Sequence, residues 1–264
     1  MGTSYEYKSL APGSIRLLLL LPGSPEDDIN VLLKEFPLEH SEGLYEAQSY
    51  TWAPTTPSKA IYCNGREIRI TANLYDALVA LRWVSEFRGL WIDQITINQQ
   101  DNAEKNSQVK LMGTIYSKAD HVLVWLSNHT WKDETVKDHI IEFDELCRRI
   151  CETYSQAFSD RLTLDDAQEE DLLKIRPGVW NSVCAIYQSN YFRRVWMIQE
   201  VVRAKECFAM ISGNLLIWKS MELMGSVLQQ ITFQQQVRSS LPNAIVLETL
   251  ERHISSLQKM VTIR

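Results

Sequence analysis

The segment from residue 90 to residue 126 constrains the fold of this chain most strongly, because two apolar runs enclose an amphipathic helix. Residues 90–92 and 121–126 have the short, nearly continuous apolar character of buried strands. Between them, Val109, Met112 and Tyr116 recur at the spacing of one helix face. Because a strand, a helix and a second strand follow one another, we expect a parallel sheet covered by helices.

Further strand-like runs precede this segment. They occupy residues 15–21, 45–52, 61–63 and 68–70, and residues 29–34 form a short amphipathic stretch. Asn64-Gly65 separates two of these runs, and both positions tolerate a positive φ, so the sequence predicts a small β-hairpin there. The predicted fold class is therefore α/β, with a central, mainly parallel sheet, this N-terminal hairpin and flanking helices.

Two helix starts carry capping signals. Thr71 or Asn73 can cap a helix that ends before Gly89 and whose apolar face is Leu74, Leu78 and Leu81. Asp101 and Glu104 have the spacing of a capping box at the start of the helix after residue 101. We therefore expect Glu104 to serve as a capping residue rather than as a catalyst.

The second half of the chain changes character. Residues 128–190 carry long helical patterns and acidic residues, which predict a helical insertion into a domain spanning residues 1–220. A helix over 191–205 and a strand over 207–211, ended by Gly213, should follow, with helix again from Leu215 onward. Residues 221–264 form a predicted helical extension whose amphipathic pattern is still running at Arg264, so we expect the full-length protein to continue.

The net charge, the apolar runs and the cysteine content limit the binding partners and the cellular location that we expect. A net charge of −6 gives no general attraction to nucleic acid or to anionic membranes. The leucine run at 17–21 is too short to span a bilayer, and it lacks the flanks of a signal peptide, so the expected location is the cytoplasm. The odd number of scattered cysteines indicates buried thiols rather than disulfides or a zinc site: Cys63, Cys147, Cys151, Cys184 and Cys207.

Three motifs in order resemble the signature of the fungal heterokaryon incompatibility (HET) family. They read Tyr-Glu-Ala-Gln-Ser-Tyr-Thr-Trp over 45–52, Leu-Trp-Ile-Asp-Gln-Ile-Thr-Ile-Asn-Gln over 90–99 and Phe-Arg-Arg-Val-Trp-Met-Ile-Gln-Glu over 192–200. The chain departs from the family pattern where Ala53 replaces a glycine, Thr96 a cysteine and Tyr191 a tryptophan. The resemblance covers most of residues 5–220 and implies a TIR-like module that triggers programmed cell death in fungal non-self recognition, a form of innate immunity.

The more distant resemblance to TIR domains implies candidate site residues. Ser49-Tyr50, Asp93 and the pair Trp196 and Glu200 follow the order of the functional positions in TIR enzymes, although Met197 stands where those enzymes have a cysteine. TIR enzymes cleave the nicotinamide N-glycosidic bond of NAD⁺, so the resemblance implies NAD⁺ as a substrate, without a bound cofactor or metal.

Glu200 is the candidate catalytic carboxylate. Trp196 and Glu200 are four residues apart on a predicted helix, and they would project from one face into one cleft. There a carboxylate could stabilise positive charge developing on the ribose, and the indole could stack on a base. In the alternative reading, Trp196 is core and Glu200 pairs with one of the nearby arginines, Arg193, Arg194 or Arg203.

The remaining candidates for substrate binding are Ser49, Tyr50, Trp52, Asp93, Asn98 and Gln99. Asp93 follows a predicted strand, at the sheet edge where α/β proteins bind ligands, and it either orients a ligand or caps a turn. The amides of Asn98 and Gln99 either contact a base or satisfy backbone groups of a loop. Trp52 either lines the cleft or fills the core.

The sequence thus predicts a death-inducing effector that hydrolyses NAD⁺ when clustered, through self-association or through other HET or receptor proteins. A non-catalytic TIR-like adaptor, acting through homotypic protein contacts, is the alternative from another class. The departures at Ala53 and Thr96 also allow a degenerate homologue.

Overall fold

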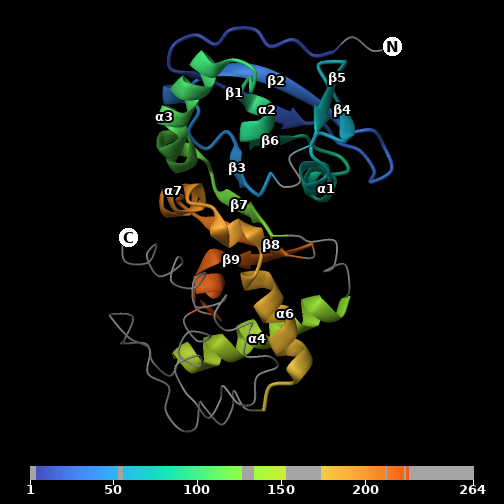
Figure 1. Ribbon diagram of the computed structural model, residues 1–264, viewed down its shortest axis with the longest axis vertical. Helices are drawn as coiled ribbons and strands as arrows, with labels where there is room; N and C mark the ends of the chain where they lie inside the picture. The colour runs from blue at the N-terminus through green and yellow to red at the C-terminus, as the bar shows by residue number, and fades with distance from the viewer. Residues whose placement is uncertain are drawn as a thin grey trace. The chain divides into compact units, whose positions relative to one another are not determined.

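The protein has an α/β fold, seen in a computed structural model that describes residues 4–52, 56–126, 134–152, 174–211, 213–222 and 224–225 (Figure 1). The strands are β1 (Ser14–Leu20), β2 (Asn30–Pro37), β3 (Glu46–Ser49), β4 (Lys59–Cys63), β5 (Arg66–Ile70), β6 (Arg88–Trp91), β7 (Val122–Trp125), β8 (Cys207–Ile211) and β9 (Asn214–Ile217). The α-helices are α1 (Ala72–Leu81), α2 (Asp93–Thr96), α3 (Asn102–Lys118), α4 (Glu134–Glu152), α6 (Pro177–Tyr187) and α7 (Trp196–Val202), with 3-10 helices η1 (Leu38–His40) and η3 (Asn190–Arg193).

The strands form a mixed sheet in the order β5-β4-β2-β1-β6-β3-β7-β8-β9. Strand β3 is parallel to both β6 and β7, and β2 is parallel to β4. Strand β1, however, is antiparallel to both β2 and β6. The prediction of a mainly parallel sheet is therefore wrong in its proportions, because β1 and β2 fold as an antiparallel pair in the middle of the strand order.

Residues 30–37 form a full strand where the sequence suggested only a short amphipathic stretch. In β2 the side chains of Val31 and Leu33 are buried, whereas Asn30 and Lys34 are not. This alternation over two residues is typical of a strand with one buried face. The pairing runs without a break over seven residue pairs, from Ser14 opposite Pro37 to Leu20 opposite Val31.

The β4–β5 hairpin confirms the prediction made from Asn64-Gly65. The two residues form the turn with φ angles of 51° and 78°, and five residue pairs follow it. Asn64 also accepts a hydrogen bond on Oδ1 from the Leu33 amide, at 3.1 Å. The left-handed backbone that asparagine and glycine tolerate thus reverses the chain at the predicted place.

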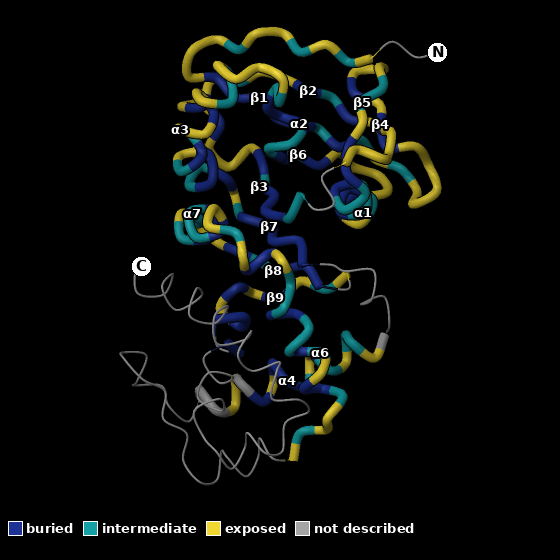
Figure 2. The backbone as a smooth tube through the Cα atoms, viewed as in Figure 1, coloured by how far each residue is buried: buried dark blue, intermediate teal, exposed yellow. Residues whose placement is uncertain are grey.

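The chain divides into two compact units. Unit 1 comprises Met1–Trp125 and Gln199–Phe208, and unit 2 comprises Leu126–Ile198 and Ala209–Arg264. The core of unit 1 is the buried sheet, drawn dark blue along β1, β6 and β3 (Figure 2), together with helices α1 and α3. Helix α3 packs through Tyr116, whose ring meets that of Trp91 edge-on at 5.5 Å and whose hydroxyl donates to the Gln48 carbonyl at 3.2 Å.

Both helices with predicted capping signals in unit 1 have an expected residue at the N-cap, Thr71 in α1 and Asp101 in α3. The Thr71 hydroxyl accepts a hydrogen bond from the Leu74 amide at 3.3 Å, and the Asp101 carboxylate accepts from the amides of Ala103 and Glu104. Val109, which the helical spacing placed on the apolar face of α3, is 39% exposed, so that assignment is wrong. The buried positions of this helix are Gln108, Met112, Ile115 and Tyr116.

Unit 2 contains the predicted helices of the insertion. Helices α4 and α6 pack through Phe143 and Trp180, whose rings lie 5.2 Å apart. The prediction of a helix from Leu215 onward is wrong at its start, because residues 214–217 form strand β9. Gly213 has a φ of 79°, which glycine tolerates, and strand β9 begins at the next residue.

The structure describes the side chains of three of the five cysteines: Cys63 and Cys207 are buried, and Cys184 is half-buried. Burial raises the pKa of the Cys184 thiol to about 11. The side chains of Cys147 and Cys151 lie outside what the structure describes. No helix in the described parts of the chain is long and apolar enough to cross a membrane.

Candidate functional site

The carboxyl ends of the parallel strands β6, β3 and β7 gather most of the predicted site residues of unit 1. Strand β3 ends at Ser49, β6 at Trp91 and β7 at Trp125. The register pairs Ala47 with Trp91 on one side and Ser49 with Val124 on the other. The three strands therefore end at the same edge, which is where open α/β sheets bind ligands.

Ser49 and Glu200 are joined directly. The Ser49 hydroxyl donates a hydrogen bond to Oε2 of Glu200, which lies on α7. Both side chains are buried, with 1% and 0% of their surface exposed. A carboxylate is expensive to bury without hydrogen-bond donors, so this hydroxyl supplies part of what water would otherwise provide.

Trp52 and Asp93 form the second contact of this edge. The indole Nε1 of Trp52 lies 3.2 and 3.1 Å from the two carboxylate oxygens of Asp93. One of these oxygens, Oδ1, also accepts from the Gln94 amide at 2.7 Å, in the first turn of α2. Both Trp52 and Asp93 are half-buried. The Asp93 carboxylate therefore stabilises the first turn of α2. It also holds the indole of Trp52, in the segment that follows β3.

The amides of Asn98 and Gln99 both bind the backbone. Oδ1 of Asn98 accepts from the Gln100 amide at 3.1 Å, and Nε2 of Gln99 donates to the Asp93 carbonyl at 2.8 Å. Of the two readings left open for these amides, the contacts within the described residues match the support of a loop. The Gln99 contact places this residue beside Asp93.

Sequence reasoning missed Asn73 as a residue of this edge. Its Nδ2 donates to the Thr51 carbonyl at 2.7 Å, and its Oδ1 accepts from Nε1 of Trp125 at 3.0 Å. One amide therefore joins the segment after β3 to the end of β7. The sequence showed Asn73 only as a rival to Thr71 for the helix cap, and because Thr71 takes that role, the Asn73 side chain is available for these contacts.

Gln94 is a second residue that sequence reasoning missed. Its Oε1 lies 3.3 Å from the Thr71 hydroxyl and 3.4 Å from the Thr71 amide. The contact joins the start of α1 to the first turn of α2. No local pattern indicates it, because the two residues are 23 positions apart.

The two remaining predicted residues have contrasting exposure. Tyr50 is 1% exposed. Trp196, at the start of α7, is 50% exposed and belongs to unit 2, whereas Glu200 on the same helix is fully buried and belongs to unit 1. The role of Trp196 as a wall of a nucleotide cleft stays a prediction.

Glu104 does not complete the predicted capping box. Its carboxylate lies 2.6 and 2.9 Å from the two terminal nitrogens of Arg16, and it also accepts from the Asn98 amide at 2.7 Å. The expected bond back to the Asp101 amide is replaced, because the buried guanidinium of Arg16 makes a stronger, bidentate partner. Asp101 alone supplies the side-chain cap.

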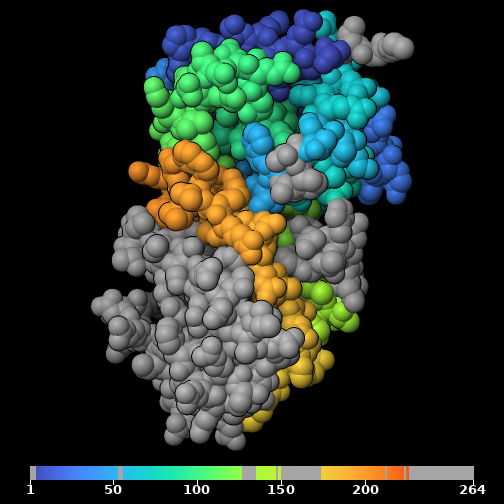
Figure 3. All heavy atoms as spheres, in the orientation of Figure 1, coloured from blue at the N-terminus to red at the C-terminus, as the bar shows by residue number. Residues whose placement is uncertain are grey.

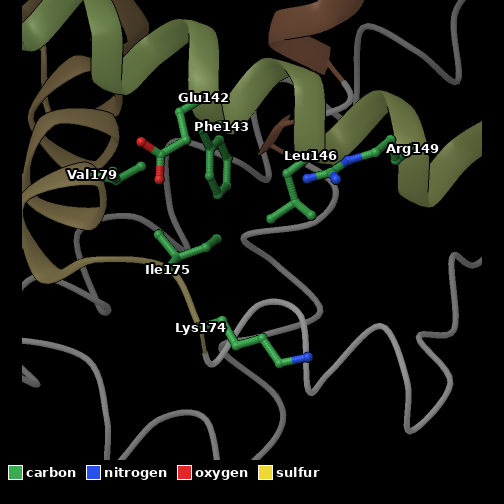
Figure 4. Close-up of a pocket in the computed structure, with 7 residues that line it drawn as sticks. All are labelled: Glu142, Phe143, Leu146, Arg149, Lys174, Ile175 and Val179. Atoms are coloured by element: carbon green, nitrogen blue, oxygen red, sulfur yellow. The ribbon is translucent and has the colours of Figure 1, made fainter.

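A separate cavity lies in unit 2, between α4 and the start of α6 (Figure 4). It has a volume of about 290 Å³ and is lined by Glu142, Phe143, Leu146, Arg149, Lys174, Ile175 and Val179. None of the predicted site residues lines it. Within the described residues, no cluster of histidine, cysteine and acidic side chains is arranged to hold a metal ion.

Comparison with known proteins connects these motifs to a family. Residues 45–200, more than half of the chain, match the family described as "Heterokaryon incompatibility protein (HET)". The chain belongs to the HET family. It is also 31% identical over 230 residues to heterokaryon incompatibility protein 6, OR allele, of Neurospora crassa, an alignment that covers 75% of this chain and 34% of that relative. The chain thus spans about a third of this relative's length, and no solved structure matches it.

The matched HET region begins at Tyr45 and ends at Glu200, so it contains all the predicted site residues. Of the departures from the HET motifs, Thr96 is buried and donates from its hydroxyl to the Ile92 carbonyl at 2.8 Å. This side-chain bond reinforces the single turn of α2, so the fold accommodates threonine where the family pattern has cysteine. Ala53 lies outside the described residues.

Proposed function

We propose that this HET domain is the cell-death-inducing effector of a fungal non-self recognition system, and that it acts by hydrolysing NAD⁺. The observation that carries the proposal is the contact of Glu200 with Ser49 at the carboxyl end of β3. Trp52 and Asp93 meet at the same edge of the sheet. Family membership supports the role in incompatibility, and the position of the carboxylate supports the chemistry.

The reaction needs few groups. Water adds to the anomeric carbon of the nicotinamide riboside as the C–N bond breaks, and nicotinamide leaves with the bonding electron pair. The products are nicotinamide, ADP-ribose and a proton. The transition state carries positive charge on the ribose, which a carboxylate such as that of Glu200 stabilises. The amides and carboxylate at the same edge suit the hydroxyl and carboxamide groups of the substrate.

The burial of Glu200 supports activation by clustering. Its side chain is 0% exposed, so the carboxylate reaches a nucleotide only after α7 or the segment following β3 moves. Self-association, or binding to another HET protein or to a receptor, would supply the free energy for that movement. The single chain is then the resting state, which suits a protein whose activity kills the cell.

Nicotinamide release from NAD⁺ by the artificially clustered chain tests this proposal. We expect release by the wild type and a loss of roughly 100-fold or more in Glu200→Gln, which keeps the size and a hydrogen-bond acceptor for Ser49. Glu206→Gln is the matched control, because Glu206 lies exposed in the same unit and loses the same charge. Absence of release at every degree of clustering contradicts NAD⁺ hydrolysis, whereas equal release from Glu200→Gln removes Glu200 as the essential group.

A non-catalytic adaptor is the second candidate function. The full burial of Glu200 favours it, as does the exposure of Val195 (79%) and Trp196 (50%) in unit 2. Exposed apolar side chains of this size are typical of protein contact surfaces. In this case Trp196→Ala abolishes cell death and self-association, and Glu200→Gln leaves both unchanged.

A further inference from the structure

A buried ion pair lies beside the loop that carries Asn98 and Gln99. Arg16 on β1 and Glu104 on α3 are joined by two parallel hydrogen bonds of 2.6 and 2.9 Å. Their side chains are only 6% and 8% exposed. The two residues are 88 positions apart, so the pair joins the beginning of the chain to the helix that follows the loop.

The ion pair holds this loop on both sides. Nη1 of Arg16 donates to the Thr96 carbonyl at 3.0 Å, at the last residue of α2. Oε1 of Glu104 accepts from the Asn98 amide at 2.7 Å, two residues later. The backbone on either side of Ile97 is therefore attached to one rigid pair of charges, and the direction in which the chain leaves α2 is set by it.

The N-terminal arm, residues 4–10, completes the surroundings of the pair. Nη2 of Arg16 donates to the Lys8 carbonyl at 2.5 Å, and the guanidinium carbon lies 5.0 Å from the centre of the Tyr7 ring. The Tyr7 hydroxyl donates to the Ile95 carbonyl at 2.9 Å. In the space-filling view, the dark blue N-terminal residues form the surface of unit 1 next to the green residues of α3 (Figure 3). The arm thus shields the pair from water, which strengthens its electrostatics.

We infer that Arg16 and Glu104 are positioning residues for the nucleotide site, because their pair fixes the loop that sets Gln99 against Asp93. This inference rests on the proposed NAD⁺ hydrolysis. The chain of contacts runs from Glu104 to the Asn98 amide, from the Gln99 side chain to the Asp93 carbonyl, and from the Asp93 carboxylate to Trp52. Neither member of the pair needs to touch the substrate.

The ionisation of Glu104 is consistent with this role. Burial alone raises the pKa of its carboxyl, but the hydrogen bonds from Arg16 and from the Asn98 amide outweigh burial and lower that pKa below its ordinary value. Glu104 therefore stays charged at neutral pH. Buried ion pairs contribute little net stability compared with apolar side chains, so a role in fixing geometry explains the arrangement better than stability does.

The test compares two buried ion pairs of unit 1 in the clustered full chain. Glu104→Gln removes the charge next to the loop. Glu46→Gln is the matched control, because Glu46 pairs with Arg88 at 2.6 Å, with similarly low exposure, at the amino ends of β3 and β6. The readouts are KM and kcat for nicotinamide release from NAD⁺, and backbone hydrogen exchange over residues 95–100.

We expect Glu104→Gln to raise KM about tenfold, with a smaller change in kcat, because a displaced loop weakens substrate binding first. Hydrogen exchange over 95–100 should become faster in this variant and should stay unchanged in Glu46→Gln. Equal KM values for the two variants in an active protein overturn the inference. If the wild type releases no nicotinamide, the proposed function fails, and the exchange data alone decide: faster exchange in Glu104→Gln supports the positioning of the loop, and unchanged exchange overturns it.

Discussion

The Ser49 hydroxyl donates a hydrogen bond to the carboxylate of Glu200, 151 residues further along the chain. This contact fastens α7 to the end of β3 at a place where both side chains are closed off from water. The motif that contains Ser49 and the motif that contains Glu200 therefore meet in space. Two stretches that the sequence offers only as separate parts of a family signature form one contact in the fold.

Removal of this hydroxyl should destabilise unit 1 measurably. Ser49→Ala takes one donor away from a buried carboxylate, and we expect the free energy of unfolding to fall by about 1–3 kcal/mol. Urea denaturation followed by circular dichroism measures the change. Ser117→Ala on α3 is the control, because its hydroxyl bonds locally to the Thr114 carbonyl and its loss should change stability by less than about 0.5 kcal/mol. Equal effects of the two substitutions would show that the Ser49 contact is weak.

Asn73 should be among the most sensitive polar residues of the sheet edge. Its amide bonds both the Thr51 carbonyl and the Trp125 indole, so Asn73→Ala removes two partners at once and should cost about 2–3 kcal/mol. Asn73→Asp keeps the acceptor for Trp125 but sets a second oxygen against the Thr51 carbonyl, so it should not restore stability. Thermal unfolding of both variants, with Asn102→Ala at an exposed position of α3 as the control, measures this. A full recovery in Asn73→Asp would contradict the donor role of Nδ2.

Two glycines of unit 1 should respond in opposite ways to alanine. A Cβ on Gly89, in β6, would lie 2.7 Å from the Leu44 carbonyl oxygen, which is backbone and cannot move aside cheaply. A Cβ on Gly113, in α3, would lie 2.9 Å from the amide nitrogen of Gln199, a side chain that can rotate away.

We therefore expect Gly89→Ala to lower the free energy of unfolding by about 1–3 kcal/mol through overpacking. Gly113→Ala should be neutral or should gain up to about 1 kcal/mol, since alanine favours the helix over glycine. Chemical denaturation of the two variants side by side measures the contrast. Similar losses in both would mean that Gln199 is held as firmly as the backbone at Leu44.

Local sequence patterns predicted the elements of this fold better than their pairing. The hairpin at Asn64-Gly65 and the cap at Thr71 depend on residues close in sequence, and both are confirmed. The antiparallel pairing of β1 with β6 joins Leu19 to Gly89, a distant part of the chain that no local period connects to it. Strand β9 was missed for a related reason, because its short apolar run fits a helix and a strand equally well.

The candidate site shows the same limit. The position of Asp93 follows from the rule that parallel strands end at one edge, and the structure joins Asp93 to Trp52 and to Gln99. The Arg16–Glu104 pair was not predicted, because the spacing of Asp101 and Glu104 satisfies a local capping pattern. Arg16, 88 residues away, binds the Glu104 carboxylate in place of the Asp101 amide. This contact is seen only in the folded chain.

A histidine at the opposite edge of the sheet should make the stability of unit 1 depend on pH. His121 precedes β7, and its Nδ1 lies 2.9 Å from Oδ2 of Asp120, while its Nε2 lies 3.4 Å from Oε2 of Glu46. Arg88 of β6 binds the same Glu46 carboxylate, and the Phe208 ring meets the imidazole edge-on at 5.4 Å. The hydrogen bond to Glu46 raises the pKa of His121 above its ordinary value of 6.5, despite the opposing effect of burial.

The direction of the pH effect follows from this raised pKa. The protonated imidazole is favoured by the folded state, so its contribution is complete below pH 6.5 and is lost as the pH rises through the folded-state pKa. We expect the free energy of unfolding of the wild type to fall over that interval relative to His121→Gln, which cannot be protonated. Urea denaturation at a series of pH values from 5.5 to 8.5, roughly one unit below and two above the ordinary pKa, measures the difference. Parallel pH profiles for the two proteins would show that Arg88 already neutralises Glu46 and leaves His121 with no charge to balance.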